Sequence, residues 1–161
     1  MAAEPFINNN VRFRQLAGYL AAKTPAGKLP GRQHIDPSEL ADLAPHIVLI
    51  DVAPQETGKL RYRVRLMGTE VVEMMGKDLT GKYVGEVLPG PAADQLAHLY
   101  GNVLLTRAPQ YRTGKFERPG REHVGYERVA FPLASDGENV DMLMLIFNRR
   151  LGESATGNGG R

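Results

Sequence analysis

The sequence of 161 residues contains no cysteine and no tryptophan. Without cysteine the chain has no disulfide, no thiolate nucleophile and no cysteine-ligated metal site, although this absence says nothing about the cellular compartment. No run approaches the ~20 consecutive apolar residues of a membrane-spanning helix, and the first residues lack a basic segment followed by an apolar one. We therefore expect a soluble, cytoplasmic protein without a membrane partner.

A surplus of one charge is also missing, since 20 Lys and Arg stand against 18 Asp and Glu, for a formal net charge of +2. A surplus this small does not imply a nucleic-acid partner. Hydrophobic residues make up 42% of the chain. A chain of this length and composition can form one domain with a packed core. It is too short for two domains of ordinary size.

Motifs of catalysis and metal binding are missing as well. The sequence contains no GxSxG motif, and the segment 76–81 lacks the spacing of a phosphate-binding loop. The histidines show no HxH or HExxH spacing that would bring them to one metal ion; they are His34, His46, His98 and His123. We predict no catalytic residue and no metal site.

The stretch from Leu60 to Gly81 shows the clearest pattern. It opens with strict alternation of Arg61, Tyr62, Arg63, Val64, Arg65 and Leu66. A period of two predicts a strand with one wet and one buried face, and the charged face is typical of a sheet edge. Apolar residues then recur at helical spacing until Gly76, so we expect a tight turn and a short helix that ends there.

Four further strands are predicted, and two of them are apolar at almost every position. Those two, 47–52 and 140–147, should be central in the sheet and covered on both faces. The remaining two candidates are Gln110–Glu117 and Val124–Leu133.

Three further helices are predicted around these strands. The N-terminal segment, residues 1–24, forms an amphipathic helix whose apolar face includes Phe13, Leu16 and Leu20. A short helix begins after an Asp-Pro-Ser-Glu capping sequence at residues 36–39. A longer helix runs from about residue 92 to 106, and its helical phase turns His98 toward water. Residues 151–161 are too polar to fold and should form a disordered tail.

This order of elements predicts an α+β fold in which helices pack on one face of the sheet, with the N-terminal helix available to cover the other. Five strings then point to a family: they are Ile35–Leu40, Ile47–Val52, Tyr62–Thr69, Gly76–Gly81 and Tyr126–Leu133. In their order and spacing they resemble a bacterial family of small stand-alone PAS-like proteins, over about residues 10 to 150. We assign the PAS-like domain to residues 33–150.

The resemblance implies a five-stranded antiparallel sheet of strand order 2-1-5-4-3, with helices that cup a ligand cavity on one face and an extra N-terminal helix. It also implies a sensory or protein-interaction role in signal transduction without catalysis. A flavin-cysteinyl adduct and a thioester-linked chromophore are excluded because the chain has no cysteine. A haem bound through the long helix would require His98 to face inward, so we predict no cofactor.

The predicted pocket lies where the edge strand, the short helices and the long helix converge. Its residues are Tyr62, Val64, Leu66, Met74, Leu79, Leu88, Leu99 and Val103. The alternative is a core that these side chains fill completely, because methionine packs irregular gaps as readily as it lines a ligand site.

The preferred function is a non-catalytic signalling module that acts through association. Its partners are a second copy, an unidentified signalling protein and a small molecule. The association surface is either the sheet face or the apolar side of the N-terminal helix. One alternative is a small-molecule enzyme on a cone or hot-dog fold that uses Asp51, which interrupts an apolar strand. Another is nucleic-acid binding by the arginine stripe 61–65.

Overall fold

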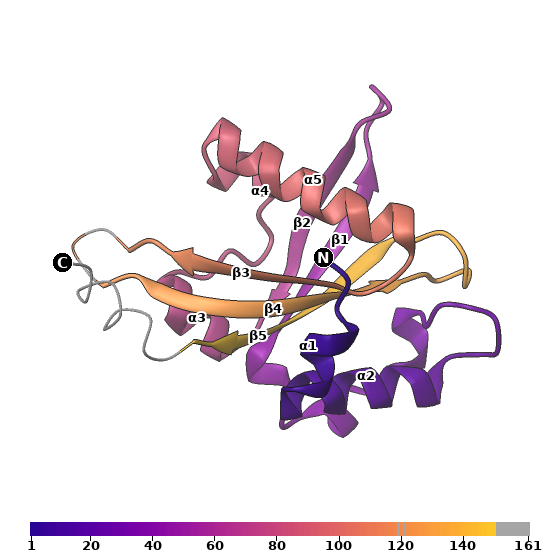
Figure 1. The fold of residues 1–161 in the computed structure, drawn as a ribbon. Coiled ribbons are helices and arrows are strands. Elements are labelled where there is room, and N and C mark those ends of the chain that lie inside the picture. Colours follow the sequence, from indigo (N-terminus) through magenta and orange to yellow (C-terminus); the bar gives the residue numbers. More distant parts are fainter. Residues whose placement is uncertain (119, 121, 151–161) are drawn as a thin grey trace.

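The computed structural model describes residues 1–118, 120 and 122–150, and it contains one antiparallel sheet of five strands in the order β2-β1-β5-β4-β3 (Figure 1). Fold class and strand order are therefore as predicted. The strands are β1 (Ile47–Pro54), β2 (Leu60–Met67), β3 (Gln110–Phe116), β4 (Val124–Leu133) and β5 (Met142–Arg149). The predicted tail lies outside the described residues.

The central strands bury side chains on both faces of the sheet. In β5 every residue from Met142 to Phe147 is buried, and successive side chains enter two different hydrophobic clusters. We call the two sides the cup face and the outer face. The cup face carries Val48, Ile50, Leu143, Leu145 and Phe147. The outer face carries Ile47, Leu49, Met142, Met144 and Ile146.

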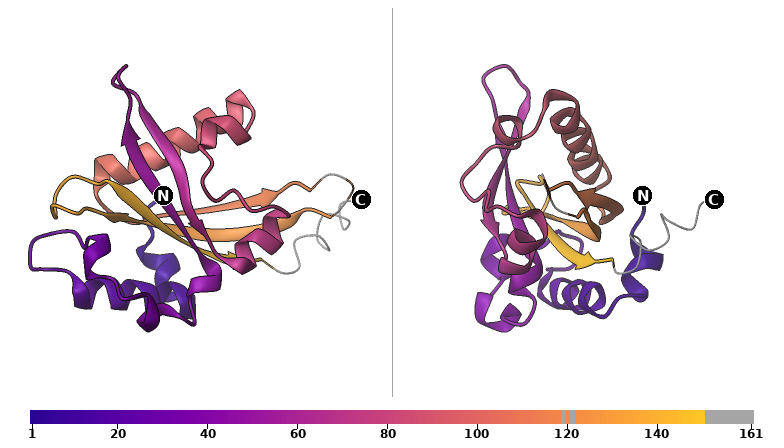
Figure 2. Two further views of the ribbon diagram at one scale, coloured as in Figure 1. Left: turned by 180° about the vertical axis from the view of Figure 1, so that it is seen from behind. Right: turned by 90° about the vertical axis from the view of Figure 1, so that its left-hand side faces the viewer.

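Helices cover each face (Figures 1 and 2). The helices on the cup face are α3 (Thr69–Met75), α4 (Val84–Val87) and α5 (Gly90–Thr106). Those on the outer face are α1 (Glu4–Asn8), α2 (Val11–Lys23) and the short 3-10 helices η1 (Arg32–His34) and η2 (Pro37–Leu40). A third 3-10 turn, η3 (Ala44–His46), leads into β1. None of the helices in the described part of the chain is long and apolar enough to cross a membrane.

Helix α2 begins at a side-chain cap and buries one face. The Asn10 side chain accepts a hydrogen bond of 3.1 Å from the Phe13 backbone N–H, which satisfies one of the free donors of the first turn. Phe13 and Leu16 are 0% exposed and Leu20 is 4% exposed, all within the outer-face cluster. In this structure the three side chains pack on the sheet of their own chain, so they are covered as long as α2 stays docked.

A chain of polar contacts ties the N-terminal helices to the outer face. Arg12 Nη1 donates to Asn148 Oδ1 over 2.8 Å, and Asn148 Nδ2 donates to Glu127 Oε2 over 3.1 Å. The Tyr111 hydroxyl donates to the other Glu127 oxygen over 3.1 Å, and the Phe6 ring stacks on Tyr111 with centroids 3.8 Å apart. These five residues, the outer-face network, join α1 and α2 to β3, β4 and β5.

A β-bulge in β2 changes which side chains face the cup. Leu49 pairs with Leu66 while Ile50 pairs with Val64, so Arg65 is an extra residue. The alternation shifts by one position there. Leu66 is consequently 44% exposed, and Met67 takes the inward position that the sequence pattern assigned to Leu66. The turn that follows ends in α3, which stops as predicted at Gly76 with a left-handed φ of 88°.

Both edges of the sheet are partly covered by the chain itself. Along β2, Val64 N–H donates to the Lys82 carbonyl and Gly81 N–H to the Val64 carbonyl, at 2.8 and 2.7 Å. Along β3, Tyr111 N–H donates to the Met1 carbonyl over 2.8 Å, and Ala2 bridges Gln110. Such pairing occupies backbone groups that another strand would otherwise use.

The boundaries of several elements differ from those expected from the sequence. The last strand begins at Met142 instead of residue 140, and residues 84–87 form α4, which the sequence pattern did not predict as a helix. The helix after Asp36 is a 3-10 turn, although its cap is present: the Asp36 carboxylate accepts from the Ser38 N–H over 2.9 Å. Capping patterns indicate where a helix begins, but not which helix type follows.

The burial of α2 predicts a large cost for truncating its central side chain. Phe13→Ala should lower the free energy of unfolding by about 3–5 kcal/mol, because it leaves a cavity between α2 and the sheet. Val11→Ala on the same helix truncates a side chain that is 58% exposed, and should change the free energy of unfolding by less than ~0.5 kcal/mol. Urea denaturation measures both; equal effects would show that α2 does not dock on the outer face.

The bulge predicts opposite tolerances at two adjacent positions. Leu66→Asp places a carboxylate in water and should change stability by less than ~0.5 kcal/mol. Met67→Asp places it against the cup-face core and should cost about 2 kcal/mol or more. Thermal melts followed by circular dichroism compare the two variants. The reverse order would mean that the simple alternation continues through Arg65.

Candidate functional site

A cavity of about 80 Å³ lies between the cup face and helices α3, α4 and α5. Its walls are almost entirely aliphatic and aromatic. The volume is about half that of the engineered ~150 Å³ protein cavity that binds benzene, and several times the space of one water. Side chains thus fill most of the space between sheet and helices, and the opening that remains has room for an apolar group smaller than benzene.

Three of the eight residues predicted for the pocket line this cavity, namely Val64, Leu79 and Leu88. Three more are buried in the surrounding core without lining it, namely Tyr62, Met74 and Val103. Leu99 is half-buried on α5 and does not line the cavity. Because of the β-bulge, Leu66 is exposed, and Met67 lines the cavity in its place.

Arg128 is the one buried charged residue among the described residues, with 3% exposure. It lies on β4 at a cup-facing position between Tyr126 and Ala130, and it lines the cavity. Its guanidinium carbon lies 5.5 Å from the centroid of the Tyr100 ring on α5, a cation–π contact. No carboxylate within the described residues lies in salt-bridge range of it.

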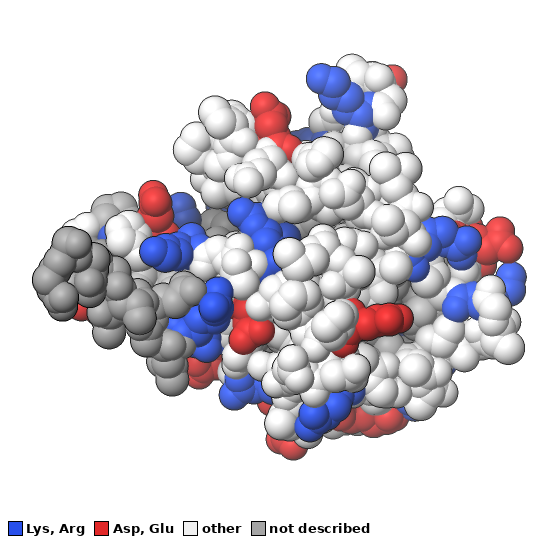
Figure 3. All heavy atoms as spheres, in the orientation of Figure 1, with Lys and Arg blue, Asp and Glu red and all other residues white. Residues whose placement is uncertain are grey.

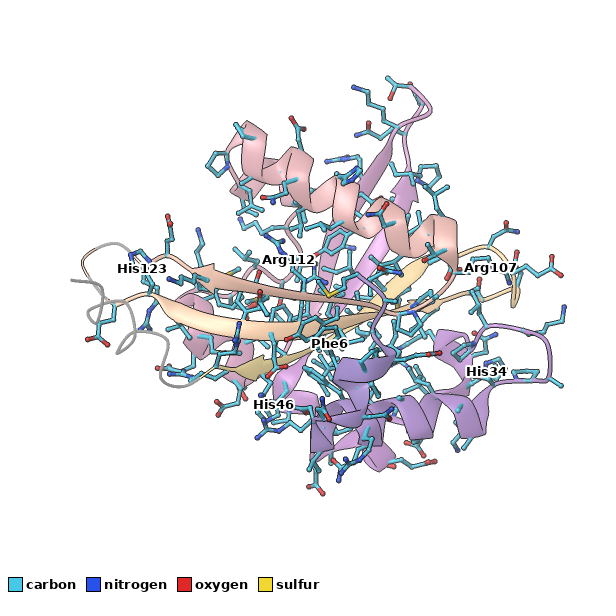
Figure 4. All side chains as sticks on the ribbon, viewed as in Figure 1. Phe6, His34, His46, Arg107, Arg112 and His123 are labelled. Carbon is cyan, nitrogen blue, oxygen red and sulfur yellow. The ribbon has the colours of Figure 1, made fainter. Side chains whose placement is uncertain are left out.

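Arg112 on β3 is the direct cross-strand neighbour of Arg128. It is half-buried, and Figure 4 shows it between α5 and the sheet. Both arginines act on the Tyr100 hydroxyl: burial raises the pKa of Tyr100, while the two positive charges lower it. The net pKa shift is upward, so the phenol stays neutral and is available as a hydrogen-bond donor.

An aromatic group forms the wall on the β3–β4 side of the cavity. Phe116 stacks on Tyr126 with centroids 4.5 Å apart, and both rings contact Phe147 on β5. Gly114 makes this possible, since a Cβ there would lie 2.5 Å from the Tyr126 hydroxyl oxygen. The glycine thus lets the Tyr126 side chain lie across β3 and close that side of the cavity.

The arginine pair was not identified from the sequence. Arg128 follows Glu127, and a tyrosine, a glutamate and an arginine in succession look like an ordinary half-exposed strand. The alternation of side chains along β4 could have revealed the burial of Arg128. Val124, Tyr126 and Ala130 lie on the same face of the strand as Arg128, and all three belong to the cup-face core. The pairing with Arg112 depends on strand register, which the sequence pattern did not supply.

The other candidate residues lie away from this cavity. Asp51 is on the outer face of the sheet, where Arg65 Nη1 lies 3.3 Å from its carboxylate. His98 is exposed on α5, and burial followed by the nearby Arg12 charge lowers the pKa of His46. Figure 4 shows His34, His46 and His123 far apart, and the described residues contain no group of three or more potential metal ligands.

The arginine stripe of β2 makes contacts within its own chain. The Arg61 guanidinium stacks 3.5 Å from the Tyr83 ring centroid and lies 3.6 Å from a Glu86 oxygen. Arg63 Nε donates to the Gly81 carbonyl over 3.4 Å. With Arg65 on Asp51, each of the three side chains is oriented by a local partner rather than gathered into one basic patch.

Comparison with known proteins agrees with this architecture. The chain is similar to the PAS domain from Bordetella pertussis BvgS, with 11% identity, a TM-score of 0.51 and coverage of 76% of this chain and 90% of that one. It is also similar to the Rhodobacter sphaeroides LOV protein, with 14% identity, a TM-score of 0.49 and coverage of 89% and 71%. At this identity the likeness to the BvgS domain concerns the fold alone. No curated protein matches the chain.

A family model gives the stronger result. The model of the PAS domain matches residues 9–147, which include α2, the whole cup and nearly all of the sheet. PAS domains are sensory and signalling modules that commonly mediate association between proteins. The five-stranded sheet in the order β2-β1-β5-β4-β3, with its cup of helices, is the arrangement that this family implies. The chain belongs to the PAS domain family.

Proposed function

We propose that this PAS domain is a non-catalytic cytoplasmic sensor whose input is a small molecule in the cup-face cavity. Its output is an association controlled by the N-terminal segment, residues 1–24, which acts as a unit distinct from the domain of residues 33–150. The partner that we propose is a second copy of the chain or a separate signalling protein.

The observation that supports this proposal is the position of the outer-face network directly behind the cavity. Tyr111 and Arg112 are successive residues of β3, and they point to opposite faces of the sheet. Glu127 and Arg128 have the same relation on β4. A small displacement of either strand by a ligand therefore moves both sides of the sheet.

Strand β5 shows the same arrangement. Phe147 lines the cavity, and the next residue, Asn148, bonds to both Arg12 of α2 and Glu127. Three neighbouring strands thus contribute one residue to the cavity side and one to the anchor of the N-terminal helices. Two discrete states of this anchor, helix docked or released, would give the domain a switch.

Release of α2 would also create a surface for association. The helix and the sheet would then expose an apolar face that includes Phe13, Leu16 and Leu20, now fully covered. A second chain that covers this face would regain the lost burial, at roughly 25 cal/mol per Å² of apolar area. Homodimerisation coupled to helix release follows from this argument.

The composition of the cavity wall supports the absence of catalysis. Among the described residues its polar side chains are Tyr100, Tyr126 and Arg128, and none of the lining residues is a carboxylate, imidazole, serine or threonine. General acid–base or nucleophilic chemistry near neutral pH uses such groups. We therefore retain no enzymatic role for Asp51, which lies on the other face of the sheet.

Weakening the outer-face network should loosen α2 selectively. Glu127→Gln replaces the charged carboxylate by a neutral amide, so the contacts with Tyr111 and Asn148 lose the strength of a charged acceptor. Because hydrogen bonds to charged groups contribute about 1.5–3 kcal/mol, the α2 amides should exchange with deuterium at least tenfold faster. Amides of β1 and β5 should keep their rates. Light scattering should also show a larger dimer fraction.

A matched control is Glu56→Gln, which makes the same change at an exposed position in the β1–β2 turn. It should alter neither the deuterium exchange of the α2 amides nor the molecular mass measured by light scattering. Unchanged α2 exchange in Glu127→Gln would contradict the proposed anchor. Faster exchange of α2 in a protein that stays monomeric at all concentrations would contradict the coupling to dimerisation.

A further inference from the structure

Two like charges face each other across the β3–β4 pair on the cup side. Arg112 and Arg128 are direct cross-strand partners, and both lie close enough to Tyr100 to influence its hydroxyl. Like charges at directly opposed positions destabilise a sheet. Within the described residues no Asp or Glu forms a salt bridge with either arginine. Among the described residues, this part of the fold therefore holds two positive charges without a carboxylate counterion.

Arg128 is the more constrained of the two. Its side chain is 97% buried, and its described interaction is the cation–π contact with Tyr100. A buried charge without an ionic partner is costly. None of the described buried side-chain nitrogens or oxygens is both fully enclosed and without a hydrogen-bond partner. The Arg128 side chain is one of those that line the cavity.

Arg112 connects this buried charge with the surface. It is half-buried and lies between α5 and the sheet (Figure 4). The space-filling view shows basic atoms at the surface between α5 and β3, surrounded mostly by uncharged atoms (Figure 3). An anion that approaches there meets two arginines that form no salt bridge with any described carboxylate.

We propose that Arg128, which lines the cavity, and its cross-strand neighbour Arg112 form an anion-binding site at one end of it, and that the ligand is a small carboxylate with a short apolar body. This proposal rests on the proposed function and specifies the chemistry of its input. The planar guanidinium fork matches a carboxylate in two parallel hydrogen bonds, and the neutral Tyr100 hydroxyl adds a third donor. The aliphatic and aromatic wall takes the rest of the ligand.

The size of the cavity limits this body. A volume of about 80 Å³ excludes a large aromatic cofactor and fits a short aliphatic chain. Inorganic phosphate would satisfy the two arginines but would leave the apolar wall without contact. A neutral alcohol of the same length would fill the wall and leave the charges unpaired. The site thus distinguishes carboxylates from both.

The test is to titrate the protein with three probes: sodium butyrate, 1-butanol and inorganic phosphate. Binding of each is measured by the change in amide chemical shifts of β3 and β4 in NMR spectra. Butyrate should bind saturably and at least tenfold more tightly than either of the others. Arg112→Gln and Arg128→Gln should each weaken butyrate binding at least tenfold. Arg63→Gln is the matched control, since it removes the same charge from an exposed position on β2 and should leave binding unchanged.

A second measurement does not depend on any ligand. Because it removes the repulsion, Arg112→Gln should melt at a higher temperature than the unmodified protein in buffer without carboxylates. Arg112 is half-buried, so this variant keeps the core intact even if Arg128→Gln fails to fold. A lower melting temperature would overturn the claim that the two charges lack a counterion.

Each contrary result in the titration has a definite meaning. Equal affinity for butyrate and 1-butanol would overturn the anion site, and equal affinity for butyrate and phosphate would overturn the apolar body. Unchanged butyrate binding in Arg112→Gln would exclude that arginine from the site. The deuterium exchange of α2 in Glu127→Gln is independent of these titrations, so failure of the carboxylate proposal leaves the helix anchor standing.

Discussion

The sheet of this domain must bury both of its faces, and the rest of the structure depends on this constraint. Strand β5 has no exposed side chain between Met142 and Phe147, so neither face can be left to solvent. Helices α3, α4 and α5 cover one side, and the N-terminal helices cover the other. Helix α2 is thus part of the core, and any signal that moves it must provide new cover for the apolar surface beneath.

The two-sided sheet also explains how a PAS domain of this size can connect its faces. Successive residues of one strand face opposite sides of the sheet. Arg128 therefore faces the cup, and its neighbour Glu127 belongs to the outer-face network. In the proposed switch, the backbone of β3, β4 and β5 connects cavity and anchor without a pathway of side chains. The strength of the proposed coupling then depends on how rigid those strands are.

Much of the fold could be predicted from the sequence, because apolar runs and period-two alternation reflect burial directly. The runs at 47–52 and 140–147 identified β1 and β5 as central, and the arginine stripe identified β2 as an edge. The bulge at Arg65 could not be predicted, since it depends on backbone pairing with β1 and leaves no trace in the polarity pattern. Because of this bulge, the sequence pattern wrongly placed Leu66 in the pocket and missed Met67. For the site, Val64, Leu79 and Leu88 were found as apolar residues near a cup, whereas Arg112 and Arg128 become a pair only through the β3–β4 register.

The covered edges of the sheet restrict how a partner can recognise this domain. Residues 81–83 run along β2, and Met1 and Ala2 pair with the start of β3. A peptide that binds by β-strand addition requires a row of free backbone donors and acceptors. At these positions it would first have to displace a segment of the domain itself. Recognition through side chains of the helices requires no such displacement, so specificity toward a partner is expected to reside in helical surface residues, whose substitution alters binding without altering the sheet.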